Sequence, residues 1–378
     1  MTEVTAEVRA SFRRHKSQPG VSADAYRQRH LERFQATSAG KRAVYLDLNY
    51  WIDLQGAAAG MPRRPEFAEL LEVLRAGVSG GQLMCPVSYS VLAELSKQTD
   101  PATRGATGHL VDDLCCGAGL MADDELIAFE VAGLFLSTLG SDKTVLDRER
   151  VWKPVGCIAS NSTLSSVPFN PTRQHRQRLE KVFFDTLLIM TAEEAVMMDL
   201  PRWASPWADL AQKLNDGNAA HVHEIDKFED LLAAEAQGAA RGSAPMIAAA
   251  VEILRKELGR PGDFSAASPD WPRLVGAALS KNETTQSALP SLYIRSGLHA
   301  LLRWNRTQKF KPNDIFDFSH AAGALGYCDL FLTEGPLKDM LGRGPLRLAE
   351  ATDCKVVASP TDALGAVQAL IAVTGSAN

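Results

Sequence analysis

The chain has 378 residues, of which 46% are hydrophobic and 22% charged, a composition typical of a soluble globular protein with two or three domains. No apolar run approaches the ~20 residues needed to span a bilayer, and the N-terminal segment lacks the apolar centre of a signal peptide, so we expect a cytoplasmic protein without membrane contact. The six cysteines include no Cys-x-x-Cys pair, which argues against a disulfide framework or a zinc knuckle.

Charge is unevenly distributed along the sequence. The formal net charge of −5 argues against a uniformly basic nucleic-acid coat. Residues 1–42, however, contain nine Lys and Arg against four Asp and Glu, so this segment carries about +5 and the remainder about −10. Residues 1–40 are therefore expected to form a basic N-terminal arm or surface helix, helical around 25–34 and ending in a linker.

The next segment alternates between strand and helix patterns. Phe67, Leu70, Leu71 and Leu74 recur with the period of a helix, and short apolar runs on either side read as strands. In chain order the sequence predicts a strand over 43–46, a helix from Asn49, a helix over 65–76, a strand over 83–87, and a helix carrying Glu94 that is capped by Ser88 or Ser90.

Residues from about 100 to 290 change character and become rich in Ala and Leu. The sequence predicts helices over 124–139, 173–198, 222–238 and 245–258. Segments rich in Ser, Asn, Pro, Gly or Asp predict loops over 152–172 and 259–273. We interpret this region as an α-helical insertion.

Alternation resumes near the end of the chain. The predicted elements are helices over 292–303 and 314–325, a strand over 329–333, a short helix over 337–341, a strand over 355–358 and a helix over 363–371. Together with the first alternating segment they form a three-layer αβα unit with parallel strands. The predicted division is an N-terminal arm (1–40), a first part of this unit (41–100), the insertion (101–287) and a second part (288–378).

Acidic residues lie at or near the ends of these elements. Asp47 follows the first strand, Glu94 lies on a helix, Asp317 lies in the first turn of another helix, and Glu334 follows a later strand. Open α/β sheets place their chemistry at the carboxyl ends of the strands. Hard cations such as Mg²⁺ and Mn²⁺ take oxygen ligands, and they activate water for phosphodiester hydrolysis. The acids therefore predict one divalent-metal site.

The order and setting of these acids resemble the PIN domain family of metal-dependent nucleases. The resemblance rests on Asp47 in YLDLNYW, Glu94 in SVLAELSK, Asp317 in DFSHAAGA and the acid after the strand in LFLTEG. It covers residues 41–100 and 288–378. It implies an α/β fold, a PIN-like parallel sheet with a large helical insertion, a Mg²⁺ or Mn²⁺ cofactor, and Asp47, Glu94 and Asp317 as catalytic metal ligands.

The fourth acid departs from the family pattern. Members of the family commonly carry Thr-x-Asp at the end of this strand, whereas this chain reads Thr333, Glu334 and Gly335. Either Glu334 reaches the metal, or Thr333 and water occupy this corner. Asp329 begins the same strand at its far end and is the weaker ligand candidate.

Each candidate also has a purely structural interpretation. Asp47 and Asn49 are residues that cap helices, and Glu94 is placed to pair with charges along its own helix. Asp314 and Asp317 share a face at a helix start, where the helix dipole favours acids, and Asp314 is expected as an auxiliary metal ligand. His320 is expected as a buried histidine or as the partner of an acid.

Basic residues precede the Asp314–Asp317 segment. Residues 293–311 contain five Lys and Arg and no acid, and basic side chains supply most of the affinity for phosphates. The predicted substrate-binding residues are Asn49, Arg295, Arg303, Arg306 and Thr333. Trp304 and Phe310 would either stack on bases or lie in the core. Further basic clusters at 13–16, 27–33 and 173–181 would either contact RNA or be solvated.

The acidic residues together with the resemblance to PIN domains predict a Mg²⁺- or Mn²⁺-dependent endoribonuclease, and the resemblance alone implies single-stranded RNA as the substrate. The alternatives are a structure-specific DNA nuclease and a catalytically weak PIN-like RNA-binding module. A phosphoaspartyl enzyme is disfavoured because Asn49 stands where a second Asp is typical, and a P-loop motif is missing from the sequence. RNA is the predicted partner, with a protein inhibitor or a second copy of the chain as further partners.

Overall fold

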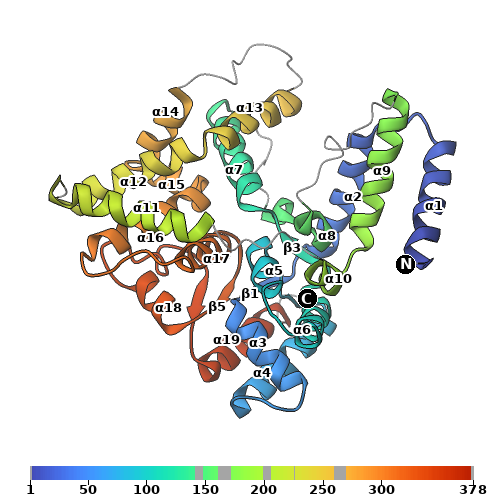
Figure 1. The fold of residues 1–378 in the computed structure, drawn as a ribbon, viewed down its shortest axis with the longest axis horizontal. Coiled ribbons are helices and arrows are strands. Elements are labelled where there is room, and N and C mark those ends of the chain that lie inside the picture. Colours follow the sequence, from blue (N-terminus) through green and yellow to red (C-terminus); the bar gives the residue numbers. More distant parts are fainter. Residues whose placement is uncertain are drawn as a thin grey trace.

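The computed structural model describes residues 2–140, 148–160, 172–198, 206–224, 226–258 and 270–375. Helices surround a sheet of four parallel strands in the order β2-β1-β5-β6 (Figure 1), so the fold is α/β as predicted. The strands are β1 (Arg42–Leu46), β2 (Leu83–Met84), β5 (Leu330–Leu332) and β6 (Lys355–Val357).

The helices next to the sheet come from both ends of the chain. They are α3 (Leu48–Ala58), α4 (Pro65–Ser79), α5 (Tyr89–Leu95), α6 (Pro101–Cys115), α17 (Asp314–Tyr327), α18 (Gly335–Gly342) and α19 (Pro360–Gly375). α19 packs on α4 and on three of the strands, while α17 packs on β5 and α5. The helices predicted at 65–76, 292–303, 314–325, 337–341 and 363–371 are confirmed, each extended at one or both ends.

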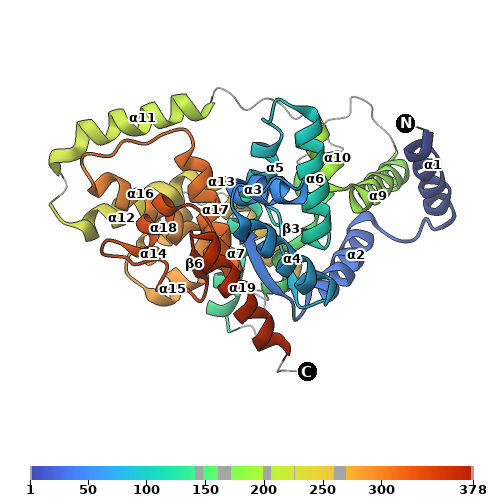
Figure 2. The same ribbon diagram turned by 90° about the horizontal axis from the view of Figure 1, so that it is seen from below.

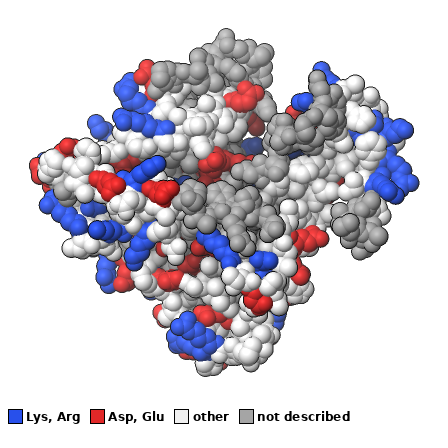
Figure 3. Space-filling model, in the orientation of Figure 1, with Lys and Arg blue, Asp and Glu red and all other residues white. Residues whose placement is uncertain are grey.

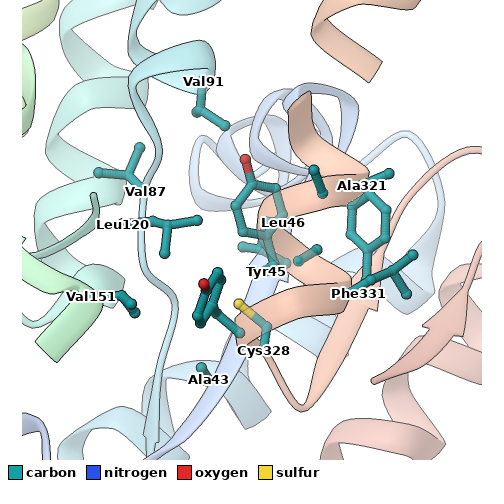
Figure 4. Packing of buried hydrophobic residues seen from close by; sticks show 14 of the residues in the cluster. Ala43, Tyr45, Leu46, Val87, Val91, Leu120, Val151, Ala321, Cys328 and Phe331 are labelled. Carbon is teal, nitrogen blue, oxygen red and sulfur yellow. The ribbon is translucent and has the colours of Figure 1, made fainter. Parts of the chain in front are cut away.

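β1 is one of the two inner strands of the sheet and is buried on both faces. Ala43, Val44, Tyr45 and Leu46 are each at most 1% exposed, which explains why the segment reads as a continuous apolar run rather than an alternating one. Figure 4 shows Ala43, Tyr45 and Leu46 in the same cluster as Phe331 of β5 and Ala321 of α17. The core thus joins two segments that lie nearly three hundred residues apart in the sequence, as the register of β1 with β5 requires.

β2 is shorter than predicted. After Met84 the backbone turns away from β1: the Cys85 amide donates to the Leu114 carbonyl, and Val87 forms a bridge with Gly119. Gly119 lies in β3 (Ala118–Leu120), which pairs antiparallel with β4 (Trp152–Pro154). The predicted strand over 83–87 therefore divides its hydrogen bonds between two neighbours.

Part of the predicted insertion shares the core of the sheet. α6 packs on α3 and α4, and its buried residues Leu110, Val111 and Leu114 belong to the main hydrophobic cluster. The prediction of a loop over 152–172 is wrong at its start, where β4 is followed by α8 (Val155–Ala159). Residues 161–171 of that prediction lie outside the described residues.

The remaining helices of the middle region follow the predicted pattern in part. They are α7 (Asp123–Thr138), α9 (Arg173–Ile189), α10 (Ala192–Met197), α11 (Pro206–His221), α12 (Phe228–Gly242), α13 (Ala244–Leu258), α14 (Asp270–Leu279), α15 (Glu283–Ala288) and α16 (Pro290–Trp304), with 3₁₀ turns at Arg148–Val151 and Val222–Glu224. Helices α7 and α13 lie where they were predicted.

Two predicted helices are corrected. The single helix expected over 173–198 is broken, because Thr191 starts a new helix with a capping box in which its hydroxyl accepts from the Glu194 amide and the Glu194 carboxylate accepts from the Thr191 amide. The helix expected over 222–238 starts only at Phe228. The loop expected over 259–273 lies largely outside the described residues, and its last four residues begin α14.

The N-terminal region forms two helices, α1 (Thr2–Ser17) and α2 (Ala23–Ser38), which pack against α9. Figures 1 and 2 place these three helices on one side of the sheet and α11, α12 and α14 to α16 on the other. Among the described residues, no helix has the length and apolar character to cross a membrane.

Candidate metal centre

Asp47 sits at the carboxyl end of β1, against the end of β5. Leu46 is in register with Leu332, so the two residues that follow, Asp47 and Thr333, lie side by side. The Asp47 amide donates to the Leu332 carbonyl at 3.0 Å, and the Thr333 hydroxyl donates to Asp47 Oδ2 at 2.8 Å. The other carboxylate oxygen accepts from the Leu48 amide at 2.6 Å at the start of α3. Two donors therefore fix this buried carboxylate.

The Thr333 hydroxyl contacts the Asp47 carboxylate rather than solvent. It was predicted to bind substrate, yet its side chain is fully buried. Because its hydroxyl is donated to Asp47, it holds that side chain in one orientation.

Glu334 and Asn49 form the exposed rim of the site. Glu334 directly follows Thr333 and begins α18, and its carboxylate accepts a hydrogen bond from the Asn49 side-chain amide. Burial, followed by the charges of Asp47 and Glu94, raises the pKa of Glu334 above its ordinary value. Glu334 therefore lies within the electrostatic field of Asp47 and Glu94.

Glu94 is held by a buried chain of hydrogen bonds. Glu94 Oε2 lies 2.8 Å from His320 Nε2, His320 Nδ1 lies 2.7 Å from the Tyr45 hydroxyl, and that hydroxyl lies 2.6 Å from Ser88 Oγ. His320 is fully buried, which by itself lowers its pKa, but the hydrogen bond to the Glu94 carboxylate and the charges of Asp47, Glu94 and Asp317 raise the pKa above its ordinary value. His320 is thus the partner of an acid.

Asp317 is the most strongly perturbed acid of the group. Burial, with the negative charges of Asp47, Glu94 and Asp314, raises its pKa to about 7 against the opposing effect of His320. Charges perturb one another in this way only over short distances, because solvent and salt screen them beyond roughly 10 Å. Asp47, Glu94 and Asp317, from three separate segments, therefore share one electrostatic environment.

Asp314 stands at the edge of this group. It begins α17, and its carboxylate accepts from the Lys311 backbone amide at 2.8 Å. Burial raises the pKa of Asp314, although that hydrogen bond and the Lys311 charge oppose the rise. Its carboxylate is thus already engaged at the helix start, one turn before Asp317.

The donor set suits a hard divalent cation, but its arrangement is not that of a closed ligand cage. Asp47, Glu94 and Asp317 offer carboxylate oxygens, the ligands that Mg²⁺ prefers. Within the part of the chain that the structure describes, no group of three or more His, Cys, Asp and Glu side chains is arranged to hold a metal ion. A cation would therefore require side-chain movement or bridging water, and Mg²⁺ usually retains several waters.

Asp329 lies at the opposite end of the sheet. Its carboxylate forms ion pairs with Arg42 at 3.1 Å and Arg148 at 3.3 Å, and it accepts from the Ala43 amide at 2.7 Å. These contacts belong to the amino end of β1, as the strand geometry predicted. Asp329 therefore does not complete the acidic group.

The predicted phosphate-binding arginines have partners within the protein. Arg295 pairs with Asp123 of α7, and Arg303 pairs with Glu235 of α12. Arg306 is exposed after the end of α16. Of the two aromatic residues, Phe310 lies in the core at 4% exposure, while Trp304 is 42% exposed and packs edge-on against Phe228. The base-stacking interpretation thus remains open for Trp304 alone.

The sequence analysis did not predict the contacts of Tyr45 with His320 and Ser88. Tyr45 lies in β1, two residues before Asp47, and the alternation of side chains along a strand places position 45 on the same side of the backbone as position 47. That spacing was the available signal. Ser88 was expected as a helix cap, and it fills that role for α5 by accepting from the Val91 amide in addition to contacting Tyr45.

Comparisons with protein-family models, with curated proteins and with solved structures returned no match for this chain. The chemistry of the site therefore rests on its own geometry.

Proposed function

We propose that this chain is a PIN-like, Mg²⁺- or Mn²⁺-dependent endoribonuclease whose insertion helices shape access to a carboxylate site. The observation that carries the proposal is geometric: Thr333 orients Asp47 at the carboxyl end of β1, and Glu94 is hydrogen-bonded to His320 of α17, the helix that also carries Asp317. Burial, together with the charges of Asp47 and Glu94, raises the pKa of Asp317. Acids that repel one another in a buried setting cost stability unless a cation neutralises them. Strongly perturbed titratable groups also gather at functional sites.

Asp47, Glu94 and Asp317 would hold the metal, with Glu334 and Asp314 at its edge. The bound metal would supply an activated water and a countercharge for phosphodiester hydrolysis. The protein's own contribution is orientation: Thr333 and the Leu48 amide fix Asp47, and His320 fixes Glu94. Asn49 restrains Glu334 at the solvent boundary, where a substrate would enter.

A fold alone does not determine a substrate. The choice of RNA over DNA therefore comes from the resemblance to PIN domains. The test is incubation of the protein with labelled single-stranded RNA, single-stranded DNA and flap DNA, with Mn²⁺ or with EDTA. The proposal expects Mn²⁺-dependent cleavage of RNA that falls by a factor of about 100 or more in both Asp47→Asn and Asp317→Asn. Cleavage of the flap substrate alone would favour a structure-specific DNA nuclease.

The matched control is Asp339→Asn, because Asp339 is an exposed acid of α18 that pairs with Arg343. It carries the same change of charge and should cleave RNA like the wild type. Equal loss in Asp339→Asn and Asp47→Asn would contradict the assignment of the site.

One observation favours a second candidate, a catalytically weak RNA-binding module. The acids of the described residues are not arranged to hold a metal, and the Glu334 carboxylate is engaged by Asn49. RNA binding that is equal in Mn²⁺ and EDTA, with no cleavage in either, would select this candidate.

A further inference from the structure

The N-terminal helices and α9 carry a concentration of positive charge on an otherwise acidic protein. α1, α2 and α9 together contain eleven Lys and Arg against six Asp and Glu, while the whole chain has a net charge of −5. Figure 3 shows Lys and Arg gathered at one edge of the molecule, over α1 and α9. We call the exposed basic residues of these two helices, apart from Arg14, which pairs with Asp185, the basic face: Arg9, Arg13, Lys16, Arg173 and Arg176.

The spacing of these residues explains why they point outward together. Arg9, Arg13 and Lys16 recur at intervals of four and three residues, which places them along one stripe of α1. The opposite stripe of α1 carries Ser11 and His15, which are buried. The stripe therefore presents its cations to solvent while the helix remains docked on α9.

The carboxylate of Asp185 in α9 joins α1, α2 and α9 through hydrogen bonds and an ion pair. Asp185 of α9 accepts hydrogen bonds from Ser11 at 2.5 Å and from Tyr26 at 2.6 Å, and it lies 2.9 Å from His15 Nε2. Arg14 completes this group with an ion pair. Because Asp185 is engaged inside the three-helix contact, its charge does not neutralise the basic face.

A second contact fixes the turn between α1 and α2. The buried ammonium of Lys181 donates to the carbonyls of Gln18 at 3.4 Å and Val21 at 2.9 Å. The cations of the basic face are thus displayed on a rigid support, and a rigid array loses less conformational entropy on binding than a flexible tail does.

From this arrangement we infer that the basic face binds the phosphate backbone of RNA, as a contact separate from the acidic site. Regularly spaced surface cations recognise a polyanion without reading its sequence, and their affinity falls steeply with salt because counterions are released. The choice of RNA rests on the proposed function. Since α1 and α9 lie toward one edge of the molecule, on one side of the sheet (Figures 1 and 2), a long RNA would contact the basic face while another part of it occupies the acidic site.

The test is equilibrium binding of a fluorescein-labelled 30-nucleotide oligouridine in EDTA, over a range of salt concentrations. The variant is Arg9→Gln, Arg13→Gln and Lys16→Gln combined, because Gln keeps a high helix propensity. We expect its Kd to rise about tenfold and the slope of log K against log salt to become shallower by about 2, since each lost phosphate contact contributes about 0.7.

The control removes an equal number of positive charges, three, from the other side of the molecule. It combines Arg241→Gln, Arg273→Gln and Lys281→Gln, three exposed residues on or next to α12 and α14. We expect its Kd to change less than twofold. Equal weakening in both variants would mean that overall charge, rather than the basic face, governs binding, and unchanged binding in the α1 variant would overturn the inference.

Two further arms make the result decisive. If the α1 variant loses helical circular dichroism, Arg173→Gln combined with Arg176→Gln tests the same face from α9, and wild-type affinity in that variant would overturn the inference. Binding to phosphatidylserine vesicles but not to RNA would also overturn it. Because the assay contains EDTA, loss of RNA cleavage leaves this inference standing, and loss of this binding leaves the proposed metal site standing.

Discussion

The Thr333 hydroxyl donates to Asp47 Oδ2 at 2.8 Å, although the two residues are separated by 286 positions in the sequence. The parallel pairing of β1 with β5 creates this contact, because Leu46 and Leu332 are in register and the next residue of each strand emerges at the same edge. Asp47 is 5% exposed and Thr333 fully buried, so the hydrogen bond is shielded from water. The fold thus delivers an oriented carboxylate to the carboxyl end of the sheet.

Thr333→Val should destabilise the protein while keeping its shape. The substitution leaves the buried Asp47 carboxylate with one donor fewer, and a lost hydrogen bond to a charged group costs about 1.5–3 kcal/mol. Chemical denaturation in EDTA measures this change. Thr361→Val is the control, since Thr361 is exposed on α19, and it should change the free energy of unfolding by less than about 0.5 kcal/mol. Equal effects would contradict the role given to Thr333.

The raised pKa of Asp317 predicts a pH dependence of stability in the absence of metal. Its pKa rises from 3.8 to about 7 on folding, so between these values the folded state binds more protons than the unfolded state. The free energy of unfolding should therefore fall as pH rises from about 4 to about 7. Asp317→Asn should flatten part of this decline in denaturation curves recorded in EDTA. Identical pH dependence of stability in the wild type and Asp317→Asn would contradict the prediction.

Glu130 should also make the free energy of unfolding fall as pH rises, as Asp317 does. It is fully buried and accepts from the Ser291 hydroxyl and the Tyr327 hydroxyl, each at 2.6 Å, and burial raises its pKa from 4.5 to about 7. Glu130→Gln should remove its share of the decline in stability above pH 5. Glu130→Ala should cost about 2–4 kcal/mol at pH 6, because the hydroxyls of Ser291 and Tyr327 lose their acceptor and a cavity remains.

The Glu130 variants separate this effect from that of the acidic site. Since Glu130 joins α7, α16 and α17, its replacement by Gln should leave Mn²⁺ binding within about twofold of the wild type. Equal loss of stability in the Gln and Ala variants at pH 6 would show that the hydrogen bonds contribute nothing.

Local patterns predicted the strands of the sheet. β1, β5 and β6 carry short apolar runs, Asp47 directly follows β1, and Glu334 stands two residues after the end of β5. The separation of Asp329 from the other acids also followed from strand length, because Asp329 precedes β5 and Glu334 follows it. The position of a residue at one end of a strand could thus be predicted from the residues next to it in the sequence.

Contacts between distant segments were less accessible. The bend that shortens β2 depends on β3, and the break at Thr191 depends on a capping box inside an otherwise helical pattern. The role of Arg303 depends on Glu235, a residue of a different helix, and periodicity within one segment holds no information about such partners. The same holds for the four side chains that converge on Asp185.

The most direct test of the shared carboxylate site is a Mn²⁺ titration followed by electron paramagnetic resonance, without nucleic acid. The account predicts that the wild type and Asp339→Asn bind Mn²⁺ alike, whereas Asp47→Asn and Asp317→Asn each bind it at least about tenfold more weakly. Wild-type protein that leaves the spectrum of free Mn²⁺ unchanged, or binding that survives both substitutions, would contradict it.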